Sequence, residues 1–130
     1  MAIVGILAGM AITSISDFKN LTRISRAEAE IRALEKEILS YATDNSTYPP
    51  DNDLASIGRG GMLDPWGQPY VYRLTPVRIF IFDKINSDFD LYSYGPDKTS
   101  SNATIIGAGS DDDIVRGRDG SFVGTALNYL

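Results

Sequence analysis

The chain has neither cysteine nor histidine, and these two absences restrict its chemistry. Without cysteine there is no disulfide and no thiol nucleophile, and without histidine the commonest general base is missing. Zinc, copper and iron sites depend largely on these two side chains, so a metal site here would be built from oxygen ligands, which favours Ca²⁺ or Mg²⁺. We therefore do not expect an enzyme.

Positive charge is also scarce. Lys and Arg number 12 against 17 Asp and Glu, which gives a formal net charge of −5. Proteins that bind nucleic acid carry a basic patch or stripe, so this balance argues against a nucleic-acid partner. The 130 residues fit one domain, and an apolar content of 43% is enough for a modest core.

A third absence is local, because the segment from Met1 to Ser16 contains no charged side chain. Sixteen helical residues span roughly 24 Å, which is shorter than the ~30 Å hydrocarbon core of a bilayer. The segment also lacks the basic start of a signal peptide. The remaining alternative is a buried helix of a soluble core, but the rest of the chain is small for wrapping a helix that is apolar all round. We interpret it as a membrane or assembly helix whose true N-terminus lies upstream of Met1.

The uncharged segment continues without a turn signal into a second helical pattern. Apolar residues recur at spacings of three and four, which is typical of one face of an α-helix. Pro49 and Pro50 should end the helix. We expect this stripe to pack on a sheet, and its members are Ile24, Ala27, Ile31, Leu34, Ile38 and Tyr41.

The middle of the chain predicts a loop followed by strands. Residues 45–69 are rich in turn-forming types, which favours a loop with one short helical turn. Because side chains in a strand alternate between its two faces, Phe80 and Phe82 would lie on the same face. Short connections between aromatic and β-branched runs predict an antiparallel meander. The candidate strands are 70–74, 78–83 and 89–94.

The tail from Pro96 to Leu130 has almost no periodicity and is rich in Gly, Ser, Asn and Asp. Such a segment is either disordered or organised by something other than an ordinary core. If the loop closes, its carboxylates meet, and packed carboxylates repel unless a cation neutralises them. Ca²⁺ suits oxygen ligands in flexible geometry, although the EF-hand spacing is absent. Spacing alone leaves two readings open, a Ca²⁺ site and solvated aspartates, for Asp97, Asp111, Asp112 and Asp113.

Several stretches resemble a known family. The run MAIVGILAGMAITSISDF resembles the N-terminal segment of type IV pilin-like proteins. The motifs at 64–70 (DPWGQPY), 89–97 (FDLYSYGPD) and 112–114 (DDI) are similar to those of the major pseudopilins of type II secretion systems. The resemblance implies an α+β, type IV pilin-like fold: a long N-terminal helix on a small three-stranded antiparallel sheet, closed by a C-terminal calcium-binding loop. It divides the chain into an apolar helix half, 1–16, in a membrane or filament core, and a globular domain, 17–130.

The resemblance also implies one bound Ca²⁺ ion. In such proteins the ligands come from carbonyls of the strand, from the Asp of the following turn and from the aspartates before the next Ile. The implied ligands here are the carbonyls of Leu91 and Ser93, with Asp97, Asp113, and Asp111 or Asp112.

The implied function is that of a structural subunit. Such a subunit polymerises through its N-terminal helix into a pseudopilus that supports protein secretion. Its expected partners are further copies of itself, other pseudopilins, inner-membrane assembly proteins and the membrane. It would be a single-pass protein of the bacterial inner membrane, with its globular domain in the periplasm. The alternatives are a type IV pilus subunit or other pilin-like filament protein, and a small Ca²⁺-dependent binding module.

Overall fold

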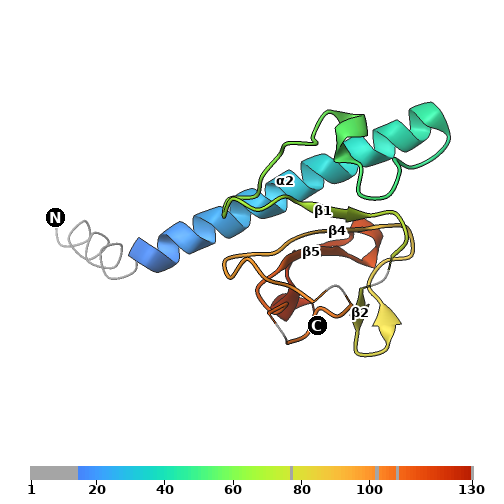
Figure 1. Ribbon diagram of the computed structural model, residues 1–130. Helices are drawn as coiled ribbons and strands as arrows, with labels where there is room; N and C mark the ends of the chain where they lie inside the picture. Colours follow the sequence, from blue (N-terminus) through green and yellow to red (C-terminus); the bar gives the residue numbers. More distant parts are fainter. Residues whose placement is uncertain (1–14, 77, 102, 108, 130) are drawn as a thin grey trace.

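One long helix lies across a face of an antiparallel sheet (Figure 1). The computed structural model describes residues 15–76, 78–101, 103–107 and 109–129. Helix α2 runs over Ile15–Asn45, and its first part projects beyond the sheet. Most of the predicted apolar half, 1–16, falls outside the described residues, so the two-part division of the chain stays a prediction. Within the described part, no helix has the length and apolar character needed to cross a bilayer.

The predicted apolar stripe of α2 is confirmed. Its central members are at most 1% exposed, and they form one core with Tyr72, Phe89, Leu91 and Ile114. Burying a large aliphatic side chain of this kind stabilises the fold by about 1.5–3 kcal/mol. The four fully buried helix residues are Ala27, Ile31, Leu34 and Ile38.

The main sheet has four antiparallel strands in the order β1-β4-β5-β6, where the prediction has three. The α+β antiparallel architecture and two of the predicted strands are confirmed. The two additional strands come from the tail. Each is only four residues long and lacks an alternating pattern, so these strands form because of pairing and burial rather than local propensity. The strands are β1 (Val71–Arg73), β4 (Asp90–Ser93), β5 (Ile114–Gly117) and β6 (Phe122–Thr125).

The predicted strand 78–83 is wrong. The chain reverses inside it, and β2 (Ile79–Phe80) pairs with β3 (Asp83–Lys84) as a separate hairpin. Phe80 and Phe82 therefore do not share a strand face, and Phe82 is 90% exposed. The reversal depends on a φ of 61° at Ile81. A β-branched residue seldom adopts this conformation, so its presence in the sequence does not indicate a turn.

Both faces of the sheet are buried. In β4, Leu91 belongs to the core beneath α2, while Tyr92 belongs to a second core on the other face together with Val115 and Ile105. This second core organises the tail. The described residues also form three short 3₁₀ helices: η1 (Leu54–Ile57), which is the predicted helical turn, η2 (Arg118–Gly120) and η3 (Ala126–Asn128).

A buried arginine connects the helix to the sheet. Arg116 in β5 is 1% exposed, and its Nε donates to Glu35 of α2. Its other nitrogens bind Asp88 at 2.7 and 2.8 Å and the carbonyl of Phe89 at 3.0 Å. The guanidinium also lies 4.0 Å from the ring centroid of Phe89. One cation therefore holds α2, β5 and the start of β4 in a single arrangement.

Candidate metal centre

The strand pairing brings the predicted aspartates together. Ser93, the last residue of β4, pairs with Ile114, the first residue of β5. The loop between these strands therefore leaves and returns at the same edge of the sheet, as in any antiparallel pair. Asp97 lies in the first turn of this loop, and Asp113 directly precedes β5.

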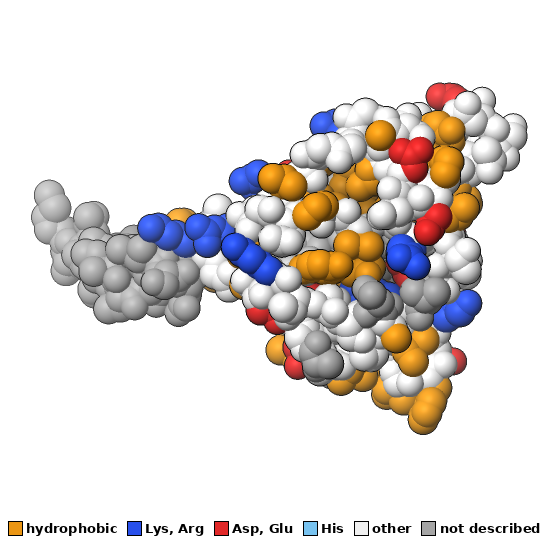
Figure 2. Space-filling view, in the orientation of Figure 1, with side chains coloured by type: hydrophobic (Ala, Val, Ile, Leu, Met, Phe, Trp, Pro, Cys, Tyr) orange, Lys and Arg blue, Asp and Glu red, His pale blue; other side chains and the backbone are white. Residues whose placement is uncertain are grey.

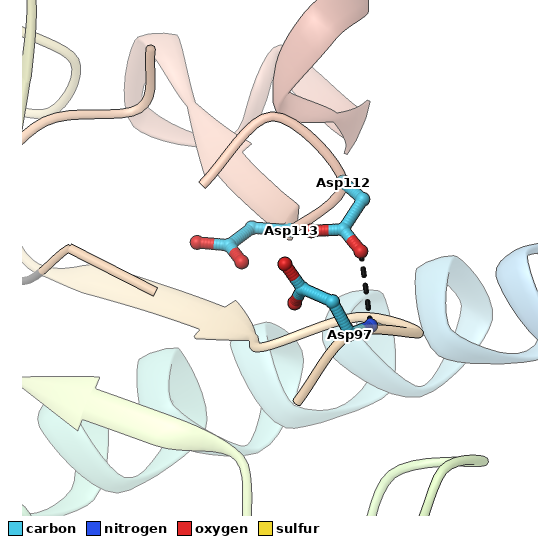
Figure 3. Close-up of side chains that lie close together, drawn as sticks. All are labelled: Asp97, Asp112 and Asp113. Atoms are coloured by element: carbon cyan, nitrogen blue, oxygen red, sulfur yellow. Dashed lines mark hydrogen bonds between the residues drawn. The ribbon is translucent and has the colours of Figure 1, made fainter. Parts of the chain in front are cut away.

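Gly95 allows the two ends of the loop to approach closely. Its φ is 72°, a region that favours glycine. A Cβ atom at this position would lie 2.2 Å from the backbone oxygen of Asp112. The close approach lets the backbone N–H of Asp97 donate to Asp112 Oδ2 at 3.0 Å (Figure 3).

Three carboxylates meet at this point. One oxygen each of Asp97, Asp112 and Asp113 lies within 4.8 Å of the others (Figure 3). Asp97 is exposed, Asp112 is half-buried and Asp113 is fully buried. Oδ1 of Asp112 and Oδ1 of Asp113 are buried and have no hydrogen-bond partner in the described part of the chain. A buried unpartnered carboxylate oxygen is costly, and an oxygen-binding cation such as Ca²⁺ would satisfy both atoms.

The other oxygen of Asp113 is already engaged. Arg78 Nη2 binds Asp113 Oδ2 at 2.8 Å, and both side chains are 0% exposed. The hydroxyl of Ser100 donates to the same oxygen. The Arg78 guanidinium also lies 4.0 Å from the ring centroid of Tyr92. Asp113 is thus held in place through Oδ2, while its Oδ1 has no hydrogen-bond partner among the described residues.

The charges at the cluster do not cancel. When all three carboxylates are ionised, they and the one guanidinium carry a net charge of two negative units, which one divalent cation would balance. Burial raises the pKa of Asp113 to about 7, because Ser100 and Arg78 only partly offset the loss of water. Burial also raises the pKa of Asp112, with the Asp97 carboxylate adding to the rise.

The remaining predicted ligands are Asp111, Leu91 and Ser93. Asp111 is exposed and outside the three-carboxylate group, and its Oδ1 accepts from the backbone N–H of Gly107. Leu91 and Ser93 are buried in β4, and the Ser93 hydroxyl donates to Asp64 Oδ2 at 2.6 Å. Ligation by the Leu91 and Ser93 carbonyls stays a prediction.

Sequence reasoning missed Arg78 and Ser100. In the sequence, Arg78 belongs to a segment with the pattern of an ordinary strand. It lies 35 residues before Asp113, the aspartate that it binds. Ser100 is one of several serines in the loop. No local signal distinguishes either residue, because each acquires its role only when β2 and the loop pack together.

Comparison with known proteins places the chain in a family. It is 30% identical to the type II secretion system core protein G of Aeromonas hydrophila over 133 aligned positions, covering 88% of this chain and 82% of that protein. It is 28% identical to the type II secretion system core protein G of Pseudomonas aeruginosa over 116 positions, covering 75% and 76% of the two chains. No family model matches the chain, and no solved structure matches it with significance. These two relationships span most of the sequence, and they agree with a long helix packed on an antiparallel sheet. The chain therefore belongs to the type II secretion system core protein G family, the major pseudopilins.

Proposed function

We propose that this protein is a structural subunit of a type II secretion pseudopilus that polymerises through its N-terminal helix. The observation that carries the proposal is the relationship to two core G proteins over most of the chain. These relatives are named as components of a secretion system and not as enzymes. The structure contributes helix α2, whose first part projects beyond the sheet (Figure 1). The sequence contributes the uncharged segment, which suits a filament core.

The physical basis of assembly is the shape of the subunit. Apolar helix segments that pack side by side would leave the sheet and the C-terminal loop as an outer shell. Contacts between unlike surfaces that do not close into a ring generate a helical fibre. The subunit would start in the bacterial inner membrane with its globular domain in the periplasm, and its partners would be other copies, other pseudopilins and inner-membrane assembly proteins.

We further propose that the loop between β4 and β5 holds one Ca²⁺ ion. The carboxylates of Asp97, Asp112 and Asp113 would bind it, with the carbonyls of Leu91 and Ser93 as additional ligands. The ion would supply positive charge for the two unpartnered buried oxygens. Its binding would stabilise the folded loop by mass action and offset the conformational entropy lost on ordering it.

The test of function is complementation. The full-length protein would be returned to its host lacking the gene, and both secretion into the medium and filament formation on overexpression would be measured. Restored secretion together with filaments is the expected result. Long extracellular filaments without any effect on secretion would contradict the pseudopilus role and favour a pilus subunit.

A further inference from the structure

Exposed apolar side chains gather in two places on the molecule. The described structure has eight large hydrophobic residues that are strongly exposed, and six of them belong to two groups. We call them the hairpin patch (Ile81, Phe82, Ile106 and Leu127) and the helix patch (Phe18 and Leu21).

The hairpin patch surrounds a pocket. A hollow of about 250 Å³ is lined by apolar residues that include Ile81, Ile106 and Leu127, and Phe82 projects beside it at the hairpin tip with 90% of its surface exposed. Figure 2 shows apolar side chains at this end of the molecule. Ile81 has a φ of 61°, a left-handed conformation that strains a non-glycine residue. The chain therefore keeps an apolar tip where a polar turn residue or glycine would be less strained.

The helix patch faces away from the protein's own core. Phe18 is 70% exposed and Leu21 is 61% exposed. With about 3.6 residues per turn, Phe18 lies on the side of α2 opposite Ile31 and Ile38, which pack on the sheet. The helix patch therefore cannot pack into the core of its own subunit. Figure 2 shows basic side chains along this part of the molecule. By helical spacing, Lys19, Arg23 and Arg26 lie on one side of α2 next to Phe18, and Arg26 also pairs with Glu30 at 3.4 Å.

The charges around the two patches are complementary. Asp111 lines the pocket of the hairpin patch, and the exposed Asp83 follows Phe82 directly. Lys84 lies in the hairpin and Arg118 at its base, where its backbone N–H donates to Ile85, but the charged residue that lines the pocket itself is Asp111. An apolar pocket with an acidic rim matches an apolar helix surface with a basic flank.

We propose that the hairpin patch of one subunit binds the helix patch of a second copy of this chain. This inference rests on the proposed function, and it names the surfaces that meet. The two patches lie at opposite ends of the molecule, the hairpin far from the projecting start of α2 (Figure 1). A contact between such unlike surfaces repeats from subunit to subunit without closing. It removes six exposed hydrophobic side chains from water and pairs Asp83 and Asp111 with the basic flank.

The absence of native cysteine makes disulfide cross-linking a clean test. Full-length double variants would combine Phe18→Cys or Leu21→Cys with Phe82→Cys or Leu127→Cys, and would be oxidised during assembly in the envelope. A head-to-tail contact gives a ladder of covalent oligomers from at least one of the four pairs. Each single variant stops at a dimer at most. The matched control joins Leu39→Cys to Leu127→Cys, because Leu39 is exposed on α2 but lies outside the helix patch.

The outcomes separate this proposal from the proposed function. Filaments in the electron microscope with no ladder from any of the four pairs, or with an equal ladder from the control pair, would overturn the contact and leave the filament role intact. Lack of filaments from the parent protein would overturn both. A second variant, Phe82→Ser, should reduce filament yield at least tenfold while leaving the melting temperature unchanged, because the side chain is exposed in the subunit. Normal filament yield from this variant would count against the contact.

Discussion

The Ser93 hydroxyl donates a 2.6 Å hydrogen bond to Asp64 Oδ2, and both side chains are at most 3% exposed. The other oxygen of Asp64 accepts from the backbone N–H groups of Trp66 and Gln68. The turn that begins at Asp64 is thus attached to the end of β4, directly before the loop that carries the aspartate cluster. Two motifs far apart in the sequence form one structural unit.

The substitution Ser93→Ala should destabilise the folded domain by about 1–3 kcal/mol, because it leaves a buried carboxylate oxygen unpaired. Urea denaturation of the domain measures the change. The control is Ser121→Ala, which removes an exposed hydroxyl bonded to the carbonyl of Arg118 and should cost no more than about 0.5 kcal/mol. Equal effects of the two substitutions would show that the Asp64 contact adds nothing.

Calcium should raise the melting temperature of the parent protein by several degrees relative to EDTA, and Mg²⁺ should not. The substitution Asp97→Asn should abolish most of this rise, because it removes one carboxylate of the cluster. Asp97 is exposed, so its loss should hardly change the stability in EDTA.

The matched control for calcium binding is Asp111→Asn, which changes an exposed aspartate outside the cluster and should keep the Ca²⁺ response. A Ca²⁺ response that persists in the Asp97 variant but disappears in the Asp111 variant would move the site to the other predicted ligand.

In EDTA, stability should fall as the pH rises. Burial raises the pKa of Asp113 from 3.8 to about 7, so the folded state binds the proton more tightly than the unfolded state. This contribution is complete below the unfolded pKa and is lost as the pH rises through the folded pKa. The groups facing the carboxyl are Arg78 and Ser100, which lower its pKa, and Asp112, which raises it.

Denaturation at a series of pH values between about 5 and 8 measures this slope. The variant Asp113→Asn should flatten it. Saturating Ca²⁺ should oppose it, because the cation binds the ionised carboxylates and competes with the proton. A parent protein whose stability in EDTA is flat or rising over this range would show that Asp113 is ionised throughout.

The substitution Arg116→Met should destabilise the protein by about 3 kcal/mol, because it leaves the largely buried carboxylates of Glu35 and Asp88 without their cation. The control is Arg59→Met. Arg59 binds Glu37 through two nitrogens, at 2.9 and 2.6 Å, but the pair is 46% and 33% exposed. An exposed pair contributes about 0–1 kcal/mol, so comparable losses in the two variants would contradict the role of burial.

The sequence by itself determined the helix and the strands β1 and β4. A stripe that recurs every three or four residues buries one face of α2 whatever it packs against, and the aromatic runs around Tyr72 and Leu91 favour strands. The sequence also predicts the acidic character of the candidate site, because Asp97, Asp112 and Asp113 can be identified as candidates without knowledge of the fold.

The tertiary structure alone decided the rest. β5 and β6 carry weak local preferences. They form because β5 pairs with β4, β6 pairs with β5, and a second core covers them. The hairpin at Ile81 depends on a conformation that its residue type disfavours. Arg78 reaches Asp113 across 35 residues, so its role arises from packing and not from any neighbouring residue. Local periodicity specifies elements that bury their own face, whereas contacts between distant segments specify which carboxylates meet and which of their oxygens lack a partner.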